Sequence, residues 1–414
     1  MKSSTKKNLV EEEILEPEGD EAKTRVVFFH QSAELYGSDK VLLTLVGTLD
    51  RSRYNPIVLL PRTGPLLHRL REAGIQTHVV PLVVVSRGNM LMTVLKFPFQ
   101  IWRTMRAIDA VLAKVRVDIV HSNTLAVLSG AVWAWRRGVK HVWHVHEIVE
   151  SPRYIKKAYA FLLGKLSWWI VCNSEATRSW IVRTMPQLAI KSQVILNAVD
   201  TASIAQQQHP KTGRERMGLA EDDFVVLLVG RISNRKGHEL LIEAAELLRE
   251  RGRDGVRYMF IGDPLQGKEH LRDRLIKRIE HSSVQGNVTL MSYRSNIESI
   301  WQVCDVAVVP SLEPESFGLV ALEAMLARKP VIAAGHGGIC EVIIDRETGL
   351  LFEPRSAVAL ADALESMVDD KIYRAKLGEY GYRRALKHFS LREFVRAFDR
   401  LYSTLAPRET RLQN

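Results

Sequence analysis

The chain has 414 residues, of which 46% are hydrophobic and 25% charged, and this composition excludes a fibrous or generally disordered protein and leaves room for two domains that each bury a core. The formal net charge of +11 favours anionic partners such as nucleotide diphosphates, anionic lipid surfaces or nucleic acid. Nucleic acid is not expected, because the sequence has no helix-turn-helix, zinc-finger or aromatic RNA-binding pattern.

The N-terminal segment predicts neither export nor a membrane anchor. Residues 1–22 are rich in Asp and Glu and poor in large apolar side chains, which is typical of a disordered acidic tail and not of a signal peptide. Residues 119–135 carry no charge, but they include polar residues and are fewer than the ~20 apolar residues of a membrane span. The three scattered cysteines predict reduced core residues, and neither a metal site nor a disulfide framework. We expect a cytoplasmic protein, and peripheral attachment to the inner face of the membrane stays open.

The first strand is expected at 25–30, where Val and Phe form an apolar run. A polar loop follows and leads into a helical run at 41–49, with Gly37 and Ser38 just before it. A strand, a glycine-containing loop and a helix form a place where an anion or a sugar can bind the helix amides. A single glycine before a helix is also common in ordinary turns, so this motif alone leaves both interpretations open.

A strand at 56–60, a helix at 66–73 and a strand at 78–82 come next, followed by a basic amphipathic stretch at 91–114. Pro98 inside this stretch predicts two helices or one kinked helix. The stretch either packs on its own domain or docks on an anionic membrane surface, where aromatic and basic residues together are favoured. The second interpretation draws on these residues in and beyond the stretch: Leu95, Lys96, Phe97, Phe99, Ile101, Trp102, Arg103, Met105, Arg106, Trp133, Trp135, Arg136, Arg137, Lys156, Lys157 and Lys165.

Strands are expected at 118–123, 142–147 and 168–173, and each ends in polar residues. His144 and His146 point to one face of their strand and His141 to the other, so a three-histidine metal site is not expected. His146 stands at the strand end, where open α/β sheets bind ligands, although a hydrogen-bonded core histidine is the ordinary alternative. A polar segment at 201–218 then predicts a connection between two domains.

The second half of the chain repeats the alternation of strand and helix. A strand at 224–229 leads through Arg231 and Lys236 into a helix from His238. Two cations beside a strand-to-helix loop suit a diphosphate, and two ordinary surface cations are the alternative. Further strands are expected at 258–263, 288–294, 306–311 and 329–334, a glycine pair follows the last of these, and helices are expected at 357–390 and 394–405.

The stretch from Glu315 to Glu323 lies between two of these strands, at the carboxyl end of the first, where open α/β sheets bind ligands. Ser316, Phe317 and Gly318 are expected to open a helix with unpaired backbone amides, which form a phosphate site. The two carboxylates can each accept hydrogen bonds from sugar hydroxyls. The alternative is a carboxylate that complements the helix dipole and a second one that is solvated.

Several of these segments together resemble glycosyltransferase family 4. Glu315–Glu323 resembles its E-x7-E signature, Gly230–Gly237 its G-R-x4-K-G motif, and His146-Glu147 its strand-end histidine. Residues 172–175 and 197–200 resemble further family segments, with Ala198 where glycine is usual, and Gly37-Ser38 replaces a common Gly-Gly pair. The resemblance covers residues 25–405.

This resemblance implies an α/β protein of the GT-B fold, with two facing Rossmann-like domains, parallel sheets and a cleft between them. Residues 23–200 would form the N-terminal, acceptor-side domain, to which a C-terminal helix at about 390–410 crosses back. Residues 201–218 would be the linker, and residues 219–389 the donor-binding domain.

The function that the resemblance implies is that of a hexosyltransferase that moves a sugar from a UDP, GDP or ADP sugar to an acceptor hydroxyl with retained anomeric configuration. The acceptor is expected to be a glycan or a lipid-linked molecule in polysaccharide or glycolipid assembly. No cofactor is expected, and no metal, because the D-x-D motif that holds a metal in the other major fold is absent from the sequence. An inactive GT-B scaffold or nucleotide-sugar sensor and a sugar-nucleotide epimerase are the alternatives.

The resemblance also implies a role for each site residue. The catalytic residues would be His146, Arg231, Lys236 and Glu315. The donor would contact Gly37, Ser38, Arg231, Lys236, Tyr293, Arg294, Glu315, Ser316, Phe317, Gly318 and Glu323. Arg231 and Lys236 would neutralise the departing diphosphate, Glu323 would hold the ribose, Glu315 the donor sugar, and Tyr293 and Arg294 would lie near the base.

Overall fold

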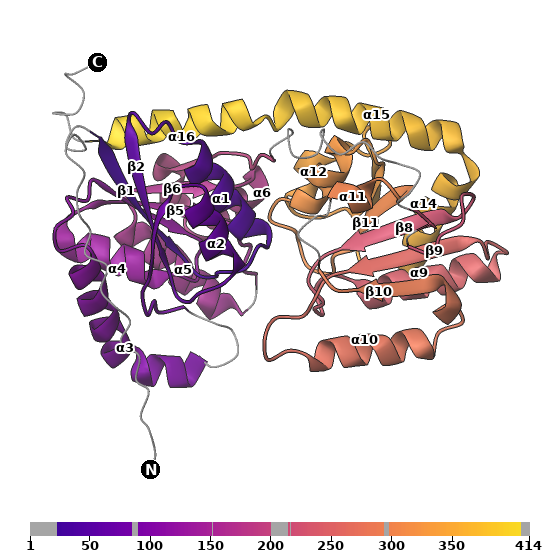
Figure 1. Ribbon diagram of the computed structural model, residues 1–414, viewed down its shortest axis with the longest axis horizontal. Coiled ribbons are helices and arrows are strands. Elements are labelled where there is room, and N and C mark those ends of the chain that lie inside the picture. Colours follow the sequence, from indigo (N-terminus) through magenta and orange to yellow (C-terminus); the bar gives the residue numbers. More distant parts are fainter. Residues whose placement is uncertain are drawn as a thin grey trace, which may run out of the picture. The chain divides into compact units, whose positions relative to one another are not determined.

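The computed structural model of the chain describes residues 23–84, 90–150, 152–199, 214–215, 217–293 and 298–406 (Figure 1). The predicted tail at 1–22 and most of the predicted linker lie outside these residues. Two compact units are distinguished: Met1–His144 with Lys165–Trp169 and Arg400–Asn414, and Val145–Gly164 with Ile170–Asp399. The domain boundaries that the sequence suggests stay a prediction.

The first sheet contains seven strands in the order β3-β2-β1-β4-β5-β6-β7, and its described strand pairs are parallel. Its inner strands are almost wholly buried, as expected for a parallel sheet that is covered on both faces, whereas the edge strands β3 and β7 are partly exposed. The strands are β1 Thr24–His30, β2 Tyr54–Leu60, β3 Gln76–Val79, β4 Ile119–Asn123, β5 Lys140–Val145, β6 Trp169–Cys172 and β7 Ser192–Val194. The helices of this half are α1 Gly37–Thr48, α2 Pro65–Glu72, α3 Met90–Val111, α4 Leu128–Arg137, α5 Arg153–Leu166, α6 Glu175–Thr184 and the 3-10 helix η2 Pro186–Lys191.

The second sheet contains six parallel strands in the order β10-β9-β8-β11-β12-β13. They are β8 Phe224–Val229, β9 Val256–Ile261, β10 Val288–Met291, β11 Val306–Val309, β12 Val331–Ala334 and β13 Leu350–Phe352. The helices are α9 His238–Glu250, α10 His270–Glu280, η3 Gln285–Asn287, α11 Glu298–Trp301, α12 Leu319–Leu326, α13 Ile339–Val342, α14 Ala357–Asp369 and α15 Lys371–His388. The predicted helical segment 357–390 is therefore two helices.

Alternate residues of the second sheet enter two separate cores, because successive side chains of a strand point to opposite faces. Val225 and Leu227 pack with α12, whereas Val226 and Leu228 pack with α9 and α14. Figure 1 shows helices on both faces of this sheet. The predicted α/β architecture with two parallel sheets is thus confirmed.

Helix α3 is a single helix that contains Pro98, so the prediction of two separate helices is wrong. Its Asp109 accepts hydrogen bonds from the buried Trp133 indole at 2.8 Å and from Arg136 and Arg137 of α4. Burial would raise the pKa of Asp109, but these donors outweigh it and lower that pKa. Trp133 and both arginines therefore fasten α3 to α4, which favours packing within the domain over contact with a membrane as the role of these three residues.

The C-terminal helix α16, Leu391–Leu405, packs on the first sheet at its end. The Tyr402 hydroxyl lies 2.8 Å from His121 Nδ1 in the buried layer, and Arg53 donates to the Ser403 hydroxyl at 2.8 Å. No helix among the described residues is both long and apolar enough to cross a bilayer. The three cysteines are free thiols; two of them are buried and Cys340 is exposed, so the prediction that all three belong to a core is wrong for Cys340.

Candidate functional site

The second sheet has a topological switch point between β8 and β11. From β8 the chain continues to one side, to β9 and β10, and β12 and β13 lie on the other side. Ligands of open α/β sheets bind at the carboxyl ends of the strands on either side of such a point. Arg231 and Lys236 follow β8, and Glu315 follows β11, so the structure places three predicted site residues here.

Lys236 and Glu315 form an ion pair across the switch point, with 2.7 Å between Nζ and Oε1. Ser311 donates a second hydrogen bond to the same oxygen. Burial would raise the pKa of Glu315, but the charge of Lys236 and these hydrogen bonds outweigh it and hold that pKa below its ordinary value. The side chains are 27% and 18% exposed, so a ligand can reach the pair. The sequence predicted both residues but neither their contact nor the role of Ser311.

Close approaches of the backbone hold the loops of the pair in place. Gly237 has φ +71°, and a Cβ there would lie 1.9 Å from the Pro310 carbonyl oxygen. Gly338 donates its amide to the Glu315 carbonyl at 2.7 Å, and a Cβ on it would lie 2.2 Å from the Ser316 carbonyl oxygen. Only glycine fits such positions. The loops after β8, β11 and β12 therefore form one packed unit.

Helix α12 begins at Leu319, with Gly318 as its N-cap at φ +104°, so the prediction that Ser316 to Gly318 open the helix is wrong. The reason is the left-handed backbone of Gly318, which a helical residue cannot adopt. The first-turn amides, which lack partners within the helix, belong to residues 319–321. Phe317 is buried against Phe389, with ring centroids 5.7 Å apart, so only its backbone could face a ligand.

Glu323 lies on α12 and is only 5% exposed. The interpretation of this carboxylate as an ordinary solvated helix residue is therefore wrong. A buried carboxylate is costly unless it is hydrogen-bonded, and such residues often serve a ligand site. The ligand-binding role of Glu323 stays a prediction.

The loops after β9 and β10 are tied together beside the β8 loop. Asp263 accepts the Tyr293 amide at 2.8 Å, and its carbonyl accepts the Ile232 amide at 3.1 Å. Gly262 precedes it with φ +157°, and a Cβ there would collide with the Gly230 carbonyl. Asp263 was missed by sequence reasoning, because a single Asp after a strand is common. Arg294, predicted near the base, lies outside the described residues.

His238 is the first residue of α9, and its buried ring packs edge-on against Phe260 with centroids 5.6 Å apart. Neither ring nitrogen has a hydrogen-bond partner among the described residues. Burial, and then the nearby charge of Lys236, lower the pKa of His238 to about 4. The histidine is therefore neutral in the folded protein at neutral pH.

This buried histidine predicts that the free energy of unfolding falls as the pH drops from about 6.5 towards 4, because in this window the unfolded chain binds a proton that the folded chain does not. At pH 5 the loss is about 2 kcal/mol. The free energy of unfolding, measured with urea, should differ less between pH 5 and pH 7.5 in His238→Gln than in the wild type. His281→Gln changes an exposed histidine and should keep the pH dependence of the wild type. If His238→Gln kept it as well, the buried His238 would not be its cause.

The first sheet has its own switch point, between β1 and β4. Gly37 and Ser38 are the first two residues of α1 there, not part of a loop before it as predicted, because Tyr36 caps the helix and Asp39 accepts the Tyr36 amide at 2.8 Å. The buried Asp39 also contacts His30 Nε2 at 2.5 Å, and His30 adjoins Asn123 of β4. His30 and Asp39 were missed because each is ordinary by itself in the sequence.

His146 follows β5 directly and is half-buried, and the Glu147 carboxylate accepts its backbone amide at 3.1 Å. His144, two residues earlier on the same strand, is fully buried, and burial followed by the nearby His121 lowers its pKa well below the ordinary value. The structure therefore separates the two histidines: His144 belongs to the core, and His146 lies at the ligand-binding edge of its sheet.

Comparison with known proteins gives the family and the fold. The model described as Glycosyltransferase Family 4 matches residues 36–203, and the model described as Glycosyl transferases group 1 matches residues 211–384. The D-inositol 3-phosphate glycosyltransferase of Kineococcus radiotolerans is 32% identical over 229 residues, which are 52% of each chain. The alpha-D-kanosaminyltransferase of Streptomyces kanamyceticus is 36% identical over 168 residues, 40% of this chain and 42% of the relative. The chain spans about half the length of the curated relatives it matches.

Solved structures align over most of the chain. Anabaena Alr3699/HepE in complex with UDP-glucose is similar with a TM-score of 0.80 and 22% identity, over 92% of this chain and 99% of the other. A glycosyltransferase from Rickettsia africae is similar with a TM-score of 0.78 and 22% identity, over 92% of this chain and 98% of the other. At such identities the likeness shows the fold, which is GT-B as predicted. With both family models matched in order, the chain belongs to glycosyltransferase family 4.

Proposed function

We propose that the protein transfers a glycosyl group from a nucleotide diphosphate sugar to an acceptor hydroxyl, with retention of the anomeric configuration. The Lys236–Glu315 ion pair at the switch point of the second sheet carries this proposal. Arg231 follows the same strand as Lys236, and the first turn of α12 begins four residues after Glu315. A cation, a carboxylate and a helix N-terminus together suit a phosphate attached to a sugar.

In the proposed reaction the bond between the sugar C1 and the diphosphate oxygen breaks, and the acceptor oxygen bonds to C1 on the same face. The acceptor proton passes to the departing diphosphate. Lys236, Arg231 and the amides of residues 319–321 stabilise the charge that builds on this leaving group, and such preorganised charge is generally the largest catalytic contribution. The hydrogen bonds from Lys236 and Ser311 both reach Oε1 of Glu315, which leaves Oε2 to accept a hydroxyl of the donor sugar.

The remaining roles follow from position. Glu323, buried on α12, would hold the ribose hydroxyls, and the loop of Tyr293 that Asp263 fixes would lie near the base. His146 and the first turn of α1, with Gly37 and Ser38, would act on the donor from the first sheet. We propose that Arg231 and Lys236 supply the positive charge in place of a metal ion, in line with the missing D-x-D motif.

The donor is proposed to be a UDP, GDP or ADP sugar, and UDP sugars are tested first because the similar Anabaena structure is a complex with UDP-glucose. The acceptor is proposed to be a glycan or lipid-linked molecule in polysaccharide or glycolipid assembly, met at an anionic membrane surface. The names of the relatives do not fix it, since they cite acceptors or sugars as different as D-inositol 3-phosphate and kanosamine. The scaffold and epimerase alternatives gain no support from these names.

Thermal unfolding with a panel of nucleotides and nucleotide sugars tests the donor site. One nucleotide series should stabilise the protein, by about 2.7 kcal/mol at 100 times its dissociation constant. Glu323→Gln should lower the affinity for this nucleotide at least about tenfold, because one charge-assisted hydrogen bond to ribose is worth about 1.5–3 kcal/mol. Glu243→Gln makes the same change at an exposed helix position and should bind as the wild type does.

Product formation then separates the alternatives. NMR of the product should show the anomeric configuration of the donor. Nucleotide binding without transfer to any glycan or lipid-linked acceptor would favour the sensor, and conversion of the donor without an acceptor would favour the epimerase. A folded protein that no nucleotide sugar stabilises would refute the proposal.

A further inference from the structure

One side of α3 carries aromatic and basic residues that face solvent. Phe99 is 67% and Trp102 53% exposed, and their rings stack with centroids 6.1 Å apart. Arg103 and Arg106 are exposed on the same side, and the Arg106 guanidinium lies 4.9 Å from the Trp102 ring. These positions are three, four and seven residues apart, so they form one stripe along the helix. We call Phe99, Trp102, Arg103 and Arg106 the α3 stripe.

In the part of α3 whose side chains are described, the opposite side is used for packing. Met105 and Ile108 of the helix, and Leu112 just after it, are buried in the core of the first sheet. Asp109 is the one acidic residue between positions 90 and 117 of the sequence, and it is bound to α4. The α3 stripe therefore has no acidic member on its own helix, and its positive charge is not balanced there. Figure 1 shows α3 beside α4, to which Asp109 fastens it.

Stacked aromatic rings flanked by arginines have the chemistry of a membrane interface. Tryptophan and other amphipathic rings gather at the headgroup level, and arginines are attracted to anionic headgroups. A helix of this kind lies in the plane of the interface with its apolar side chains inserted. Two large exposed rings cost free energy in water, whereas contact with a bilayer would bury them.

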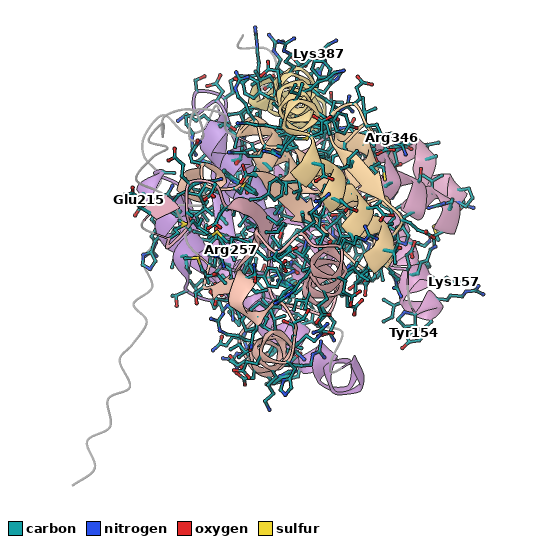
Figure 2. The ribbon with its side chains drawn as sticks, turned by 90° about the vertical axis from the view of Figure 1, so that its right-hand side faces the viewer. Tyr154, Lys157, Glu215, Arg257, Arg346 and Lys387 are labelled. Atoms are coloured by element: carbon teal, nitrogen blue, oxygen red, sulfur yellow. The ribbon has the colours of Figure 1, made fainter. Side chains whose placement is uncertain are left out.

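A second basic helix, α5, offers a weaker surface of the same type. Figure 2 shows Tyr154 and Lys157 of α5 projecting outward, and Phe161 and Lys165 are exposed on the same helix. Its exposed rings do not stack in a described pair, and the exposed Glu150 lies shortly before the helix. The stacked pair and the presence of tryptophan single out α3.

We propose that the α3 stripe docks the protein on an anionic phospholipid bilayer, with Phe99 and Trp102 inserted and Arg103 and Arg106 on the headgroups. This inference rests on the proposed function, in which the acceptor is met at a membrane. The docked helix would keep the enzyme in the layer where a lipid-linked acceptor has its polar end.

Co-sedimentation of the full chain with vesicles tests the proposal. Binding to vesicles of phosphatidylcholine with phosphatidylglycerol should exceed binding to pure phosphatidylcholine vesicles, and it should fall as salt screens the attraction. Arg103→Gln with Arg106→Gln should weaken binding about 30-fold, as expected for two basic residues at an anionic surface. Phe99→Ala with Trp102→Ala should weaken it at least about tenfold, because the inserted apolar area is lost.

Matched variants on another helix distinguish a specific effect of the α3 stripe on vesicle binding from an effect of the protein's overall positive charge. Lys371→Gln with Lys376→Gln removes the same charge from exposed positions of α15, and Tyr380→Ala removes an exposed ring of that helix; both should bind vesicles as the wild type does. Equal losses in the α3 and α15 variants, or a loss in Lys157→Gln with Lys165→Gln that the α3 variants lack, would overturn the proposal. Nucleotide stabilisation, measured in parallel, should be unchanged in every variant, so a failure of the donor site is recognised separately.

Discussion

Lys236→Ala is expected to lower kcat/KM for the nucleotide sugar by about 10²–10³-fold, the range found when one preorganised group that stabilises developing charge is removed. The ammonium lies 2.7 Å from Glu315 Oε1 at the carboxyl end of the second sheet, where the departing diphosphate is proposed to lie. Ser311, the other hydrogen-bond donor to that oxygen, is uncharged and cannot replace the lost positive charge.

A second consequence of Lys236→Ala concerns Glu315 itself. The charge of Lys236 and its hydrogen bond counteract the burial that would raise the pKa of this carboxyl. Without them the pKa of Glu315 should rise, and the residual activity of the variant should increase with pH over a higher range than that of the wild type, as the carboxylate forms. Steady-state rates across pH, together with nucleotide affinity from thermal unfolding, measure both effects.

Arg235→Ala is the matched control, because Arg235 is the adjacent residue and equally cationic. Its guanidinium is bound to the exposed Glu313 at 2.6 Å and not to Glu315. This variant should keep kcat/KM within about threefold, since an exposed ion pair contributes less than about 1 kcal/mol. Similar losses in the two variants would show that only the summed charge of the loop matters and would remove Lys236 from its proposed role.

The sequence was sufficient where local pattern and chemistry coincide. Phe224–Val229 is a continuous apolar run, as a parallel strand buried on both faces requires. The residues after such strands therefore had to lie at the carboxyl edge of a sheet, which placed Arg231, Lys236 and Glu315 correctly. Helix α9 also begins at His238 as predicted, because Gly237 in a left-handed conformation ends the loop.

The sequence was not sufficient where a contact joins distant segments. Lys236 and Glu315 are 79 positions apart, and their pairing depends on β8 and β11 being neighbours, which spacing alone does not reveal. The same holds for His30 with Asn123, 93 positions apart. The arginines of α4 looked like a free basic surface because nothing local indicated that Asp109 of α3 would bind them. The partners of these residues are set by tertiary contacts, which the local sequence pattern does not show.

Gly237→Ala is expected to destabilise the protein by about 3–5 kcal/mol, the range of substitutions that force a backbone rearrangement. The added methyl would lie 1.9 Å from the Pro310 carbonyl oxygen, a backbone atom that cannot rotate away. The φ of +71° adds about 1 kcal/mol for any residue with a Cβ. Thermal unfolding of the second unit should shift down by about 10 °C.

Gly252→Ala separates the collision from the backbone conformation. Gly252 has a similar φ of +79°, but no atom lies within 4 Å of the added methyl, so this variant should lose only about 1 kcal/mol. The two variants also differ in function. To relieve the collision in Gly237→Ala, the loop after β8 must move away from Pro310, and Lys236, the preceding residue, moves with it. At temperatures at which both variants are folded, Gly237→Ala should therefore bind the nucleotide more weakly than the wild type, whereas Gly252→Ala should bind it as the wild type does. Equal stability of the two variants would mean that the loops after β8 and β11 are not packed against each other, and the donor site would then lack the rigid support that its chemistry requires.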